Sequence, residues 1–259
     1  MQLTGNTILI TGGGSGIGRG LAGAFHKLGN KVIIAGRRKD VLDQTTGANP
    51  GMASIRLDID DPAAILAFAK KIVAEHPALN VLINNSGIMR LEDLVNHPED
   101  LSGPEAVITT NLLGPIRLTS ALLPQLARQS HPVIMNVTSS LAFAPLAFAP
   151  VYCATKAALH SWTESLRYQL SRTGTEVIEL VPPYLQTELT GSRQASDPMA
   201  MPLNDFILES MQILQSLPGV AEVVVENAKP QRFAAEGGTQ GYNALVNGFN
   251  DAIAKMMSA

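Results

Sequence analysis

Short runs of β-branched and aliphatic residues alternate along the chain with longer segments in which apolar residues recur every three or four positions. The runs predict buried strands, and the recurrence predicts amphipathic helices. Because the predicted strands are apolar almost throughout, both faces of their sheet need cover, which is typical of a parallel sheet. The predicted strands are residues 7–10, 31–35, 52–58, 81–83, 133–137 and 177–181.

The predicted helices lie between these strands. They run from the glycines after the first strand to Leu28, and then over residues 39–44, 63–75, 105–125, 151–170 and 205–217. Asp61 is the predicted N-cap of the third helix, and Pro62 suits its first position. The alternation predicts an α/β fold, a doubly wound parallel sheet (Rossmann-like), in a single domain over residues 1–259.

Composition excludes several classes of function. The 259 residues are 46% hydrophobic and 16% charged, with a net charge of -3, and no basic run is longer than residues 37–39. The chain therefore lacks the basic footprint of a protein that binds nucleic acid or an anionic membrane. The longest weakly polar stretch, residues 141–154, is too short to span a bilayer, and the amino terminus has no signal-peptide pattern. We expect a cytoplasmic protein.

Cys153 is the single cysteine, so an internal disulfide is impossible. It stands next to Tyr152 and could be a reactive thiol. A small packing residue is the favoured interpretation, because no partner that would activate the thiol is identifiable. We predict no metal site.

A glycine-rich turn, Thr11 to Gly18, follows the first predicted strand and opens a helix. Glycines let the backbone approach a pyrophosphate closely, and the N–H groups and dipole of a helix start favour its negative charge. Tight turns also need glycine, but the position of this turn within a βαβ unit favours dinucleotide binding.

The end of the second predicted strand bears on the type of dinucleotide. This strand is followed by Gly36, Arg37 and Arg38. Folds that prefer NAD usually carry an acidic residue here for the ribose 2′-hydroxyl, whereas a nearby arginine accommodates the 2′-phosphate of NADP. The arginines could alternatively form a solvated basic turn. We expect NADP(H) as the cofactor, in preference to NAD(H).

Three further segments have alternative interpretations. Asn84 to Gly87 follow the fourth predicted strand and form either a shaped loop at the ligand-binding edge of the sheet or an ordinary turn. Asn111, inside an apolar helical stretch, either satisfies irregular backbone or belongs to a polar network. Residues 188–217, which contain Met199 and Met201, are either a surface insertion or, as we predict, a substrate lid.

Tyr152 and Lys156 are the residues with the clearest chemistry. In a helix, a spacing of four places the phenol and the ammonium on one face. A nearby cation favours the phenolate, so the pKa of the phenol, ordinarily about 10, should be lowered. Tyr152 is thus a predicted acid–base residue, and Ser139 stands at the end of the fifth predicted strand, thirteen residues before it.

With these motifs in this order, the chain resembles the short-chain dehydrogenase/reductase family in its single-domain form, over residues 5–190. The Thr11–Gly18 turn is similar to that family's cofactor loop, and residues 84–87 look like its Asn-Asn-Ala-Gly element with serine in place of alanine. The positions of the family's catalytic tetrad are filled by Asn111, Ser139, Tyr152 and Lys156. The opening stretch also resembles a bacterial subgroup named after a D-alanylation locus, a name that specifies no substrate.

The resemblance implies hydride transfer between a nicotinamide and a carbonyl or alcohol carbon. Tyr152 would exchange the proton, and Ser139 would position the same oxygen. Lys156 would lower the pKa of Tyr152 and hold the nicotinamide ribose, while Asn111 would order a water that relays protons. Asp58 would meet the adenine. The implied cofactor contacts are Thr11, Gly12, Gly14, Ser15, Gly16, Ile17, Gly18, Arg37, Arg38, Asp58, Ile59, Asn85, Ser86, Gly87, Tyr152, Lys156, Pro182 and Thr187.

The chain departs from the family pattern at two positions. Pro183 stands where the family usually has glycine, which restricts the backbone beside the nicotinamide. Ser15 stands where some NADP-preferring members carry a basic residue, so the NADP expectation rests on Arg37 and Arg38 and on the missing acidic residue.

We therefore expect an NADP(H)-dependent carbonyl reductase or alcohol dehydrogenase. Enoyl reductases of the same family space the catalytic tyrosine and lysine further apart. The alternative is a non-catalytic nicotinamide-nucleotide-sensing protein on the same fold. An apolar small-molecule substrate is suggested by Met89, Leu141, Phe143, Phe148 and Tyr184. The resemblance also implies a homodimer or homotetramer assembled through the helices that bear Asn111 and Tyr152.

Overall fold

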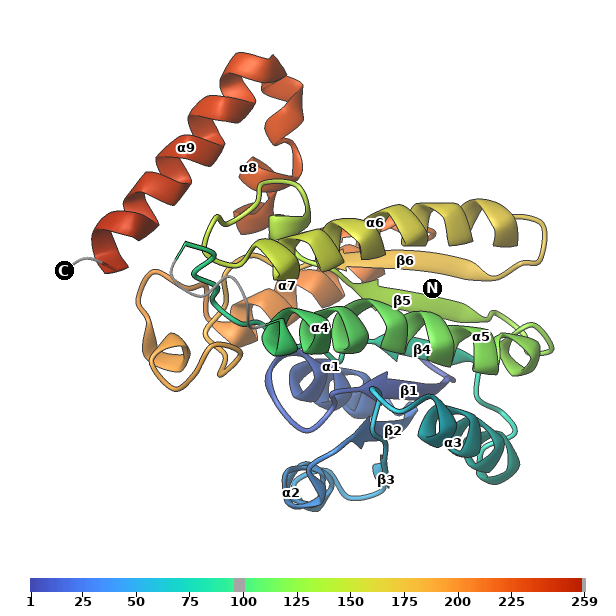
Figure 1. The fold of residues 1–259 in the computed structure, drawn as a ribbon. Helices are drawn as coiled ribbons and strands as arrows, with labels where there is room; N and C mark the ends of the chain where they lie inside the picture. The colour runs from blue at the N-terminus through green and yellow to red at the C-terminus, as the bar shows by residue number, and fades with distance from the viewer. Residues whose placement is uncertain (96–100, 258–259) are drawn as a thin grey trace.

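A computed structural model describes residues 1–95 and 101–257 of the chain. Within these residues one sheet of seven parallel strands runs in the order β3-β2-β1-β4-β5-β6-β7 (Figure 1). The predicted doubly wound α/β fold is confirmed. The strands are β1 (Thr7–Thr11), β2 (Lys31–Gly36), β3 (Ala53–Arg56), β4 (Val81–Asn84), β5 (Val133–Val137), β6 (Glu176–Val181) and β7 (Glu222–Val224).

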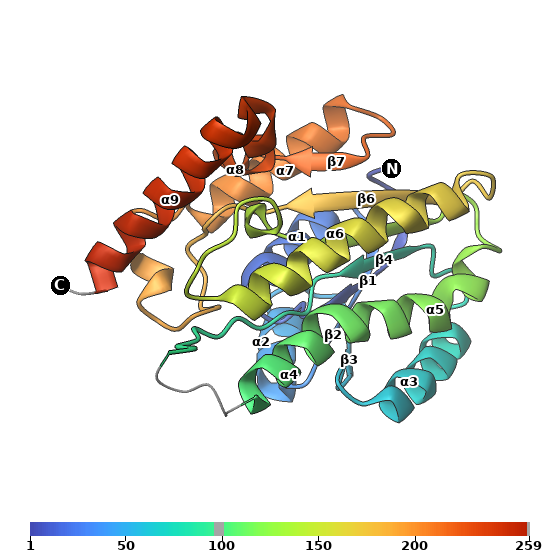
Figure 2. The same cartoon turned by 45° about the horizontal axis from the view of Figure 1, so that its top comes forward.

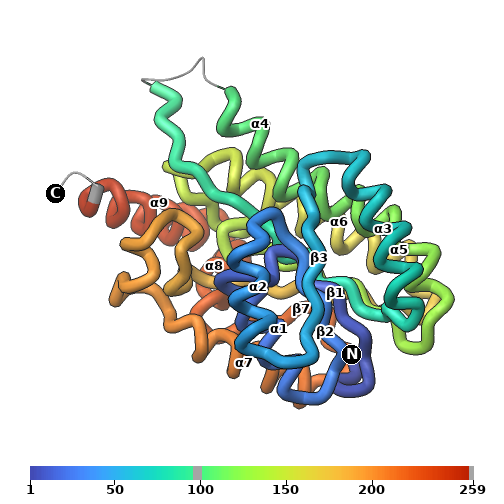
Figure 3. Tube along the Cα trace, turned by 90° about the horizontal axis from the view of Figure 1, so that it is seen from below, coloured from blue at the N-terminus to red at the C-terminus, as the bar shows by residue number. Residues whose placement is uncertain are grey.

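Helices cover both faces of this sheet (Figures 1 and 3). They are α1 (Gly16–Lys27), α2 (Lys39–Gly47), α3 (Pro62–Glu75), α4 (Ser102–Ile108), α5 (Gly114–Leu126), α6 (Pro150–Leu170), α7 (Leu203–Ser216), α8 (Lys229–Arg232) and α9 (Gly238–Met257). A π-helical turn, η1 (Thr109–Leu113), joins α4 to α5. Short 3₁₀ turns are η2 (Ser140–Ala142), η3 (Gln194–Ser196), η4 (Glu226–Ala228) and η5 (Ala234–Gly237).

Successive residues of a strand enter different cores. Ile8 and Ile10 of β1 pack with side chains of α1 and α7, whereas Leu9 between them packs with side chains of α3, α5 and α6. All three are completely buried. This is why the strands read as continuous apolar runs rather than alternating ones, and it confirms the parallel, two-sided sheet.

The predicted apolar helix over residues 105–125 corresponds to the long helical stretch Ser102–Leu126. In the described part of the chain it is the one helix long and apolar enough, by length and composition, to cross a membrane. Its residues Leu118, Leu122 and Leu126 are completely buried in the core shared with α3, β4 and β5. Packing against the sheet therefore accounts for its apolar character.

Several predicted boundaries are wrong by a few residues. The third strand ends at Arg56 rather than at residue 58, and α2 continues to Gly47 rather than ending at residue 44. Asp61 is confirmed as the N-cap of α3, because its carboxylate accepts a hydrogen bond from the N–H of Ala63 at 2.8 Å. The elements β7, α8 and α9 lie beyond the last predicted helix.

The predicted lid region, residues 188–217, divides into two parts. The segment before α7 closes on itself, because the N–H of Gln186 donates to the carbonyl of Met201 and the N–H of Met201 donates to the carbonyl of Tyr184. In contrast, α7 packs on α1 and buries Phe206 and Ile207. The helix is thus part of the core, and the lid stays a prediction for the segment before it.

Alanine at Phe206 tests whether α7 is structural. The ring is completely buried, so its removal should lower the free energy of unfolding by about 3–5 kcal/mol. Leu208, two residues further along the same helix and 60% exposed, provides the matched control, for which alanine should change the value by less than about 0.5 kcal/mol. Urea unfolding of both variants measures the difference, and equal effects would place α7 outside the core.

Candidate active site

The site forms where the strand order reverses. β1 pairs with β2 on one side and with β4 on the other. After β1 and β2 the chain crosses to one face of the sheet, and after β4 and β5 it crosses to the other face. Such a switch point leaves a crevice at the carboxyl edge of a parallel sheet. The glycine turn, Asn85, Ser139 and the start of α6 all lie at this edge.

The glycine turn is shaped by close contacts with its neighbours. Gly12 and Gly16 have φ of 65° and 51°, in the left-handed region that disfavours side chains. A Cβ on Gly12 would lie 2.8 Å from Nδ2 of Asn85, and a Cβ on Gly18 would collide with the same amide and with the carbonyl of Gly12. Gly12 and Gly18 are required because the turn lies directly against the loop after β4.

Thr11 and Asn85 hold these two segments together. The buried Thr11 hydroxyl oxygen accepts from the N–H of Asn85 at 2.9 Å and from the N–H of Ser86 at 3.1 Å. The Asn85 amide in turn donates to the carbonyl of Thr11 at 2.9 Å. Residues 84–87 therefore form a shaped loop rather than an ordinary turn. Thr11 and Asn85 are predicted cofactor contacts, and in this structure their side chains bind the protein backbone.

The residues at the start of α1 fit a bound pyrophosphate. The N-cap Ser15 has extended backbone, and in the described structure no side-chain hydrogen bond from it caps the helix. The first turn carries no acidic residue. Its N–H groups and the positive end of the helix dipole thus face the glycine turn without a competing carboxylate. Thr187, predicted to contact the nicotinamide, lies on this side, since a Cβ on Gly16 would be 3.6 Å from its methyl group.

The two arginines after β2 reach toward the same crevice from different sides. Arg38 donates from Nη2 to Oγ of Ser15 at 3.3 Å, and Arg37 pairs with the Asp60 carboxylate at 3.1 Å. Asp60, which the sequence analysis did not single out, also accepts from the Thr110 hydroxyl at 2.6 Å. Both arginines are exposed, and Arg38 contacts the glycine turn through its hydrogen bond to Ser15.

Asp58, the predicted adenine contact, and Ile59, a predicted cofactor contact, follow β3 beside this segment. The carboxylate of Asp58 accepts from the N–H of Asp60 at 3.1 Å. Ile59 is buried, and a Cβ on Gly114 would collide with its side chain. Asp58 thus shapes the turn that would lie under the adenine.

Asn111 occupies the π-helical turn η1 and is almost completely buried. Its amide donates to the carbonyl of Ile88 at 2.9 Å, and its carbonyl oxygen accepts from the N–H of Ile88 at 2.8 Å. The amide also lies 3.3 Å from the hydroxyl of Thr155. Both alternatives for Asn111 are therefore correct, since it satisfies irregular backbone after β4 and belongs to a polar network with α6.

Ser139, Tyr152 and Lys156 meet on one side of α6. The ammonium of Lys156 donates to the carbonyl of Val137 at 2.8 Å and lies 5.7 Å from the centroid of the Tyr152 ring. A Cβ on Gly87 would be 3.8 Å from the same ammonium, which places the loop after β4 opposite it. The Ser139 hydroxyl caps η2 by accepting from the N–H of Leu141 at 3.1 Å.

The expected lowering of the Tyr152 pKa is wrong in this structure. Burial raises the pKa of the phenol to about 12, and the side-chain hydrogen bond with Ser139 lowers it only in part. Burial also lowers the pKa of Lys156 to about 8, while the charge of Glu179 raises it. Desolvation wins because both groups are almost completely buried and the ammonium faces the Val137 carbonyl rather than the phenol oxygen. Tyr152 is thus neutral near pH 7 and can donate a proton.

An apolar cluster surrounds the Tyr152 ring. Its buried members are Val107, Leu146, Ala149, Tyr152 and Cys153, and partly buried Ile88, Met89, Leu141, Phe148, Val151, Phe249 and Ile253 pack against them. Burial raises the pKa of the Cys153 thiol, which supports its interpretation as a packing residue. Of the predicted pocket residues, Phe143 lies elsewhere, with its ring edge against His160.

The C-terminal helix α9 supplies part of this cluster. Figure 2 shows α9 on the side of the molecule toward which the β6 arrow points. Asn250 fixes it there, because its side chain accepts from the N–H of Ala147 at 2.6 Å and donates to the carbonyl of Pro145 at 3.1 Å. The sequence analysis missed this contribution, and the recurrence of Phe249, Ile253 and Met256 at helical spacing is the signal that could have shown an amphipathic helix.

A buried carboxylate, Glu179, was also missed. It lies in the middle of β6, where a charged residue interrupts an apolar strand, and that interruption was its signal in the sequence.

No group of three or more potential metal-ligating His, Cys, Asp or Glu residues is found within residues 1–95 and 101–257.

Known proteins are similar to this chain in sequence and in fold. The sequence profile of the family described as short chain dehydrogenase matches residues 6–198. An uncharacterized oxidoreductase, DltE, from Bacillus subtilis is 43% identical over 189 residues, covering 73% of this chain and 75% of the relative. A short chain dehydrogenase from Burkholderia cenocepacia, solved in complex with NADP, has a TM-score of 0.81 at 24% identity, covering 95% of this chain and 99% of the other. A 3-ketoacyl-(acyl-carrier-protein) reductase from Brucella melitensis, complexed with NADH, has a TM-score of 0.76 at 27% identity and covers 88% and 100%.

Alanine at Gly18 tests the fit of the glycine turn. The added methyl group would force the turn away from Asn85, so dinucleotide affinity should fall at least about tenfold, with a loss of about 1–3 kcal/mol in stability. Gly23 in the same helix is the control, because a Cβ there meets no atom within 4 Å and alanine should stabilise the helix by about 0.5–1 kcal/mol. Fluorescence titration with dinucleotide and thermal unfolding measure both effects. Unchanged dinucleotide affinity in the Gly18 variant would contradict binding of the dinucleotide at the glycine turn.

Proposed function

The chain belongs to the short-chain dehydrogenase family, and on this premise we propose that it is an NADP(H)-dependent oxidoreductase that interconverts a carbonyl and an alcohol. The observation that carries the proposal is the meeting of Ser139, Tyr152 and Lys156 beside the glycine turn, with Asn111 behind them. Four polar residues, from the segment after β5, from α6 and from η1, thus lie near the carboxyl edge of the sheet.

When bound, the dinucleotide supplies or accepts the hydride. Tyr152 donates its phenolic proton to the substrate oxygen, because its raised pKa keeps it protonated near pH 7. The Ser139 hydroxyl, just after the carboxyl end of β5, positions the same oxygen. The Lys156 ammonium lies on the same helix face and stabilises the negative charge left on the phenol.

Preference for NADP(H) over NAD(H) rests on the chain's own residues, since relatives have been solved with either nucleotide. Gly36 leaves no carboxylate at the end of β2 to bind a ribose 2′-hydroxyl. The Arg38 guanidinium contacts Ser15 of the glycine turn, and the neighbouring Arg37 guanidinium pairs with Asp60. Both are partly solvated and available to a 2′-phosphate.

The substrate that fits this crevice is an apolar carbonyl compound. The segments around it expose large apolar side chains to solvent, namely Leu91, Leu94, Val95, Tyr184, Leu189 and Met199. A ligand that covered them would gain from burying this surface. In this proposal the segment 188–201 closes over the substrate, hinged at its paired ends near Gln186 and Met201.

The chain would act as a cytoplasmic homodimer or homotetramer.

A non-catalytic, nucleotide-sensing role is disfavoured by the buried lysine beside a buried tyrosine. Burying the lysine charge is unfavourable for folding, and a sensing role would not require it, whereas the proposed catalysis does.

Phenylalanine at Tyr152 tests the proposed chemistry. Removing the phenolic oxygen should lower carbonyl reduction by a factor of at least about 10²–10⁴, with NADPH affinity retained. Tyr168, 83% exposed on the same helix, is the control, and its phenylalanine variant should keep full activity. NADPH oxidation over a panel of aldehydes and ketones measures turnover. Retained turnover in the Tyr152 variant would exclude the assignment.

Aspartate at Arg37 or Arg38 tests the cofactor preference. Loss of a charged contact to the 2′-phosphate should weaken NADPH binding by about 10- to 100-fold and leave NADH binding nearly unchanged. The same substitution at Arg128, after the end of α5, controls for the change in net charge. Titration of each variant with both nucleotides gives the ratio of affinities, and a constant ratio would remove the basis for NADP.

A further inference from the structure

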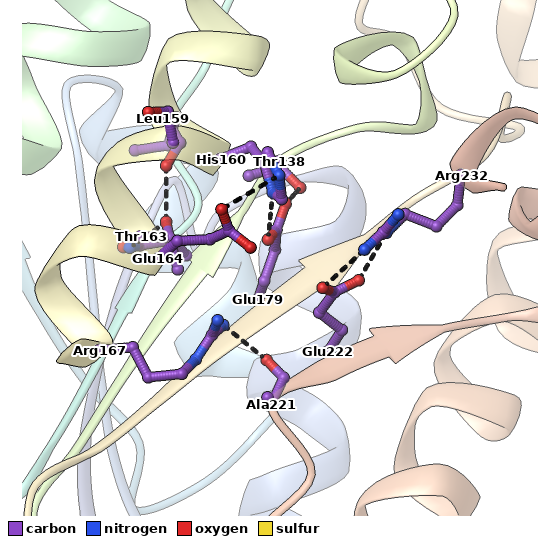
Figure 4. Close-up of polar contacts among 12 residues, drawn as sticks. Thr138, Leu159, His160, Thr163, Glu164, Arg167, Glu179, Ala221, Glu222 and Arg232 are labelled. Atoms are coloured by element: carbon purple, nitrogen blue, oxygen red, sulfur yellow. Dashed lines mark hydrogen bonds and ion pairs between the residues drawn. The ribbon is translucent and has the colours of Figure 1, made fainter. Parts of the chain in front are cut away.

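The buried carboxylate of Glu179 joins the two elements that carry the proposed catalytic residues. It is completely buried in β6, between β5 and β7. One carboxylate oxygen accepts from the Thr138 hydroxyl at 2.7 Å, at the end of β5. The other lies 2.8 Å from Nδ1 of His160, on α6 (Figure 4).

Both partners of this carboxylate stand next to catalytic positions. Thr138 immediately precedes Ser139, and His160 is one helical turn after Lys156. The carbonyl that accepts from the Lys156 ammonium belongs to Val137, on the other side of Thr138. Backbone hydrogen bonds already tie this segment to β6 and the residue after it, from the N–H of Thr138 to the carbonyl of Leu180 at 2.9 Å and from the N–H of Ser140 to the carbonyl of Pro182 at 2.8 Å. The side-chain bond from Thr138 to Glu179 adds to them between the Lys156 acceptor and the Ser139 hydroxyl.

We propose that Glu179 is a positioning residue, which helps to hold Ser139 and the Val137 carbonyl through Thr138 and supplies a buried negative charge that acts on Lys156. The proposal deepens the proposed function and rests on it. A fully buried carboxylate is unfavourable unless its oxygens are bonded and its charge is compensated. The bonds to Thr138 and His160 meet the first requirement. The Lys156 ammonium meets the second, together with His160 when its ring is protonated.

Other charged groups around His160 do not replace Glu179. Glu164 lies 3.9 Å from Nε2 of His160 on the solvent side of α6. Glu222, next to Glu179 in the register of β6 and β7, is held by both nitrogens of Arg232 at 2.6 and 2.9 Å. Figure 4 shows this pairing, and of these carboxylates it is Glu179 whose charge raises the pKa of Lys156.

Two arginines complete the set of groups that face this network. The Arg167 guanidinium donates to the carbonyls of Val177 and Ala221, both at 2.9 Å, and so ties α6 to the edge of the sheet. The Arg232 guanidinium lies 4.5 Å from the centroid of the Phe143 ring, and that ring lies edge-on against His160 at 4.7 Å between centroids. Aromatic and cationic groups thus shield His160 from solvent on this side.

The pair His160–Glu179 changes its net charge with pH. The hydrogen bond to Glu179 raises the pKa of His160, against burial, and the charges of Glu164 and Glu222 raise it further. Below that pKa the pair is neutral, and above it the pair carries one negative charge. As pH rises, the pair therefore becomes more negative and favours the protonated form of Lys156 more strongly. A rise in pH is also the change that would remove the proton from Lys156.

Glutamine at Glu179 is the direct test. Because the carboxylate raises the pKa of Lys156, its removal should lower that pKa further below about 8. NMR of protein labelled with ¹³C-lysine follows the Lys156 Cε resonance against pH, and a Lys156→Arg variant assigns it. Glutamine at Glu164, 56% exposed, is the matched control and should leave the titration nearly unchanged. An unchanged Lys156 titration in Glu179→Gln would overturn the proposal.

A substitution pair at Thr138 tests the positioning role without removing the buried charge. Valine keeps the size of the side chain but loses the hydroxyl, whereas serine keeps the hydroxyl. With NADPH and para-nitrobenzaldehyde as the carbonyl probe, Thr138→Val should lower kcat about tenfold or more with an unchanged KM for NADPH, and Thr138→Ser should restore it. The loss of kcat at alkaline pH should also begin at lower pH in Glu179→Gln. Equal kcat in the valine and serine variants would overturn the positioning role.

The two measurements separate this proposal from the proposed function. The Lys156 titration requires neither turnover nor bound nucleotide, so it decides the role of Glu179 even if the wild-type protein reduces no carbonyl. Conversely, turnover that survives in Tyr152→Phe would exclude the proposed chemistry while leaving the titration result intact.

Discussion

The desolvation of the Lys156 ammonium is the constraint on which the site depends. A cation held almost completely out of water is unfavourable by several kcal/mol unless protein groups replace its hydration. Here the replacements come from separate parts of the chain. The Val137 carbonyl accepts a hydrogen bond, Glu179 provides opposite charge, and the loop at Gly87 lies across from it. The geometry of β5, β6, α6 and the loop after β4 is coupled through this one charge.

A second constraint is the close packing of the glycine turn on the loop after β4. Thr11 and Asn85 use their hydrogen-bonding capacity to join these segments, and Gly12 and Gly18 leave no room for side chains between them. The turn is therefore rigid before any ligand arrives. A preorganised turn reduces the ordering that a dinucleotide would have to impose on binding.

The sequence predicts the parts of the fold that depend on local pattern. The six strands from β1 to β6 and the helices between them follow from hydrophobic periodicity, and the positions of Tyr152 and Lys156 on one helix face follow from their spacing. The direction of the Tyr152 pKa shift does not follow, because spacing shows the cation but not the burial that outweighs it. The roles of Asp60 and Glu179 depend on residues far away in the sequence, and no local pattern specifies such pairs.

Chemistry and selectivity lie in separable parts of this chain. The proposed catalytic residues lie between 111 and 156, within the region that matches the family, whereas Phe249 and Ile253 of α9 lie well beyond it and wall the cluster around Tyr152. Amino acid changes in α9 can therefore reshape the wall without disturbing the hydrogen bonds that hold Lys156 and Ser139. In evolutionary terms, descendants of such a chain can explore new ligands by drift in one helix, while purifying selection preserves the rest.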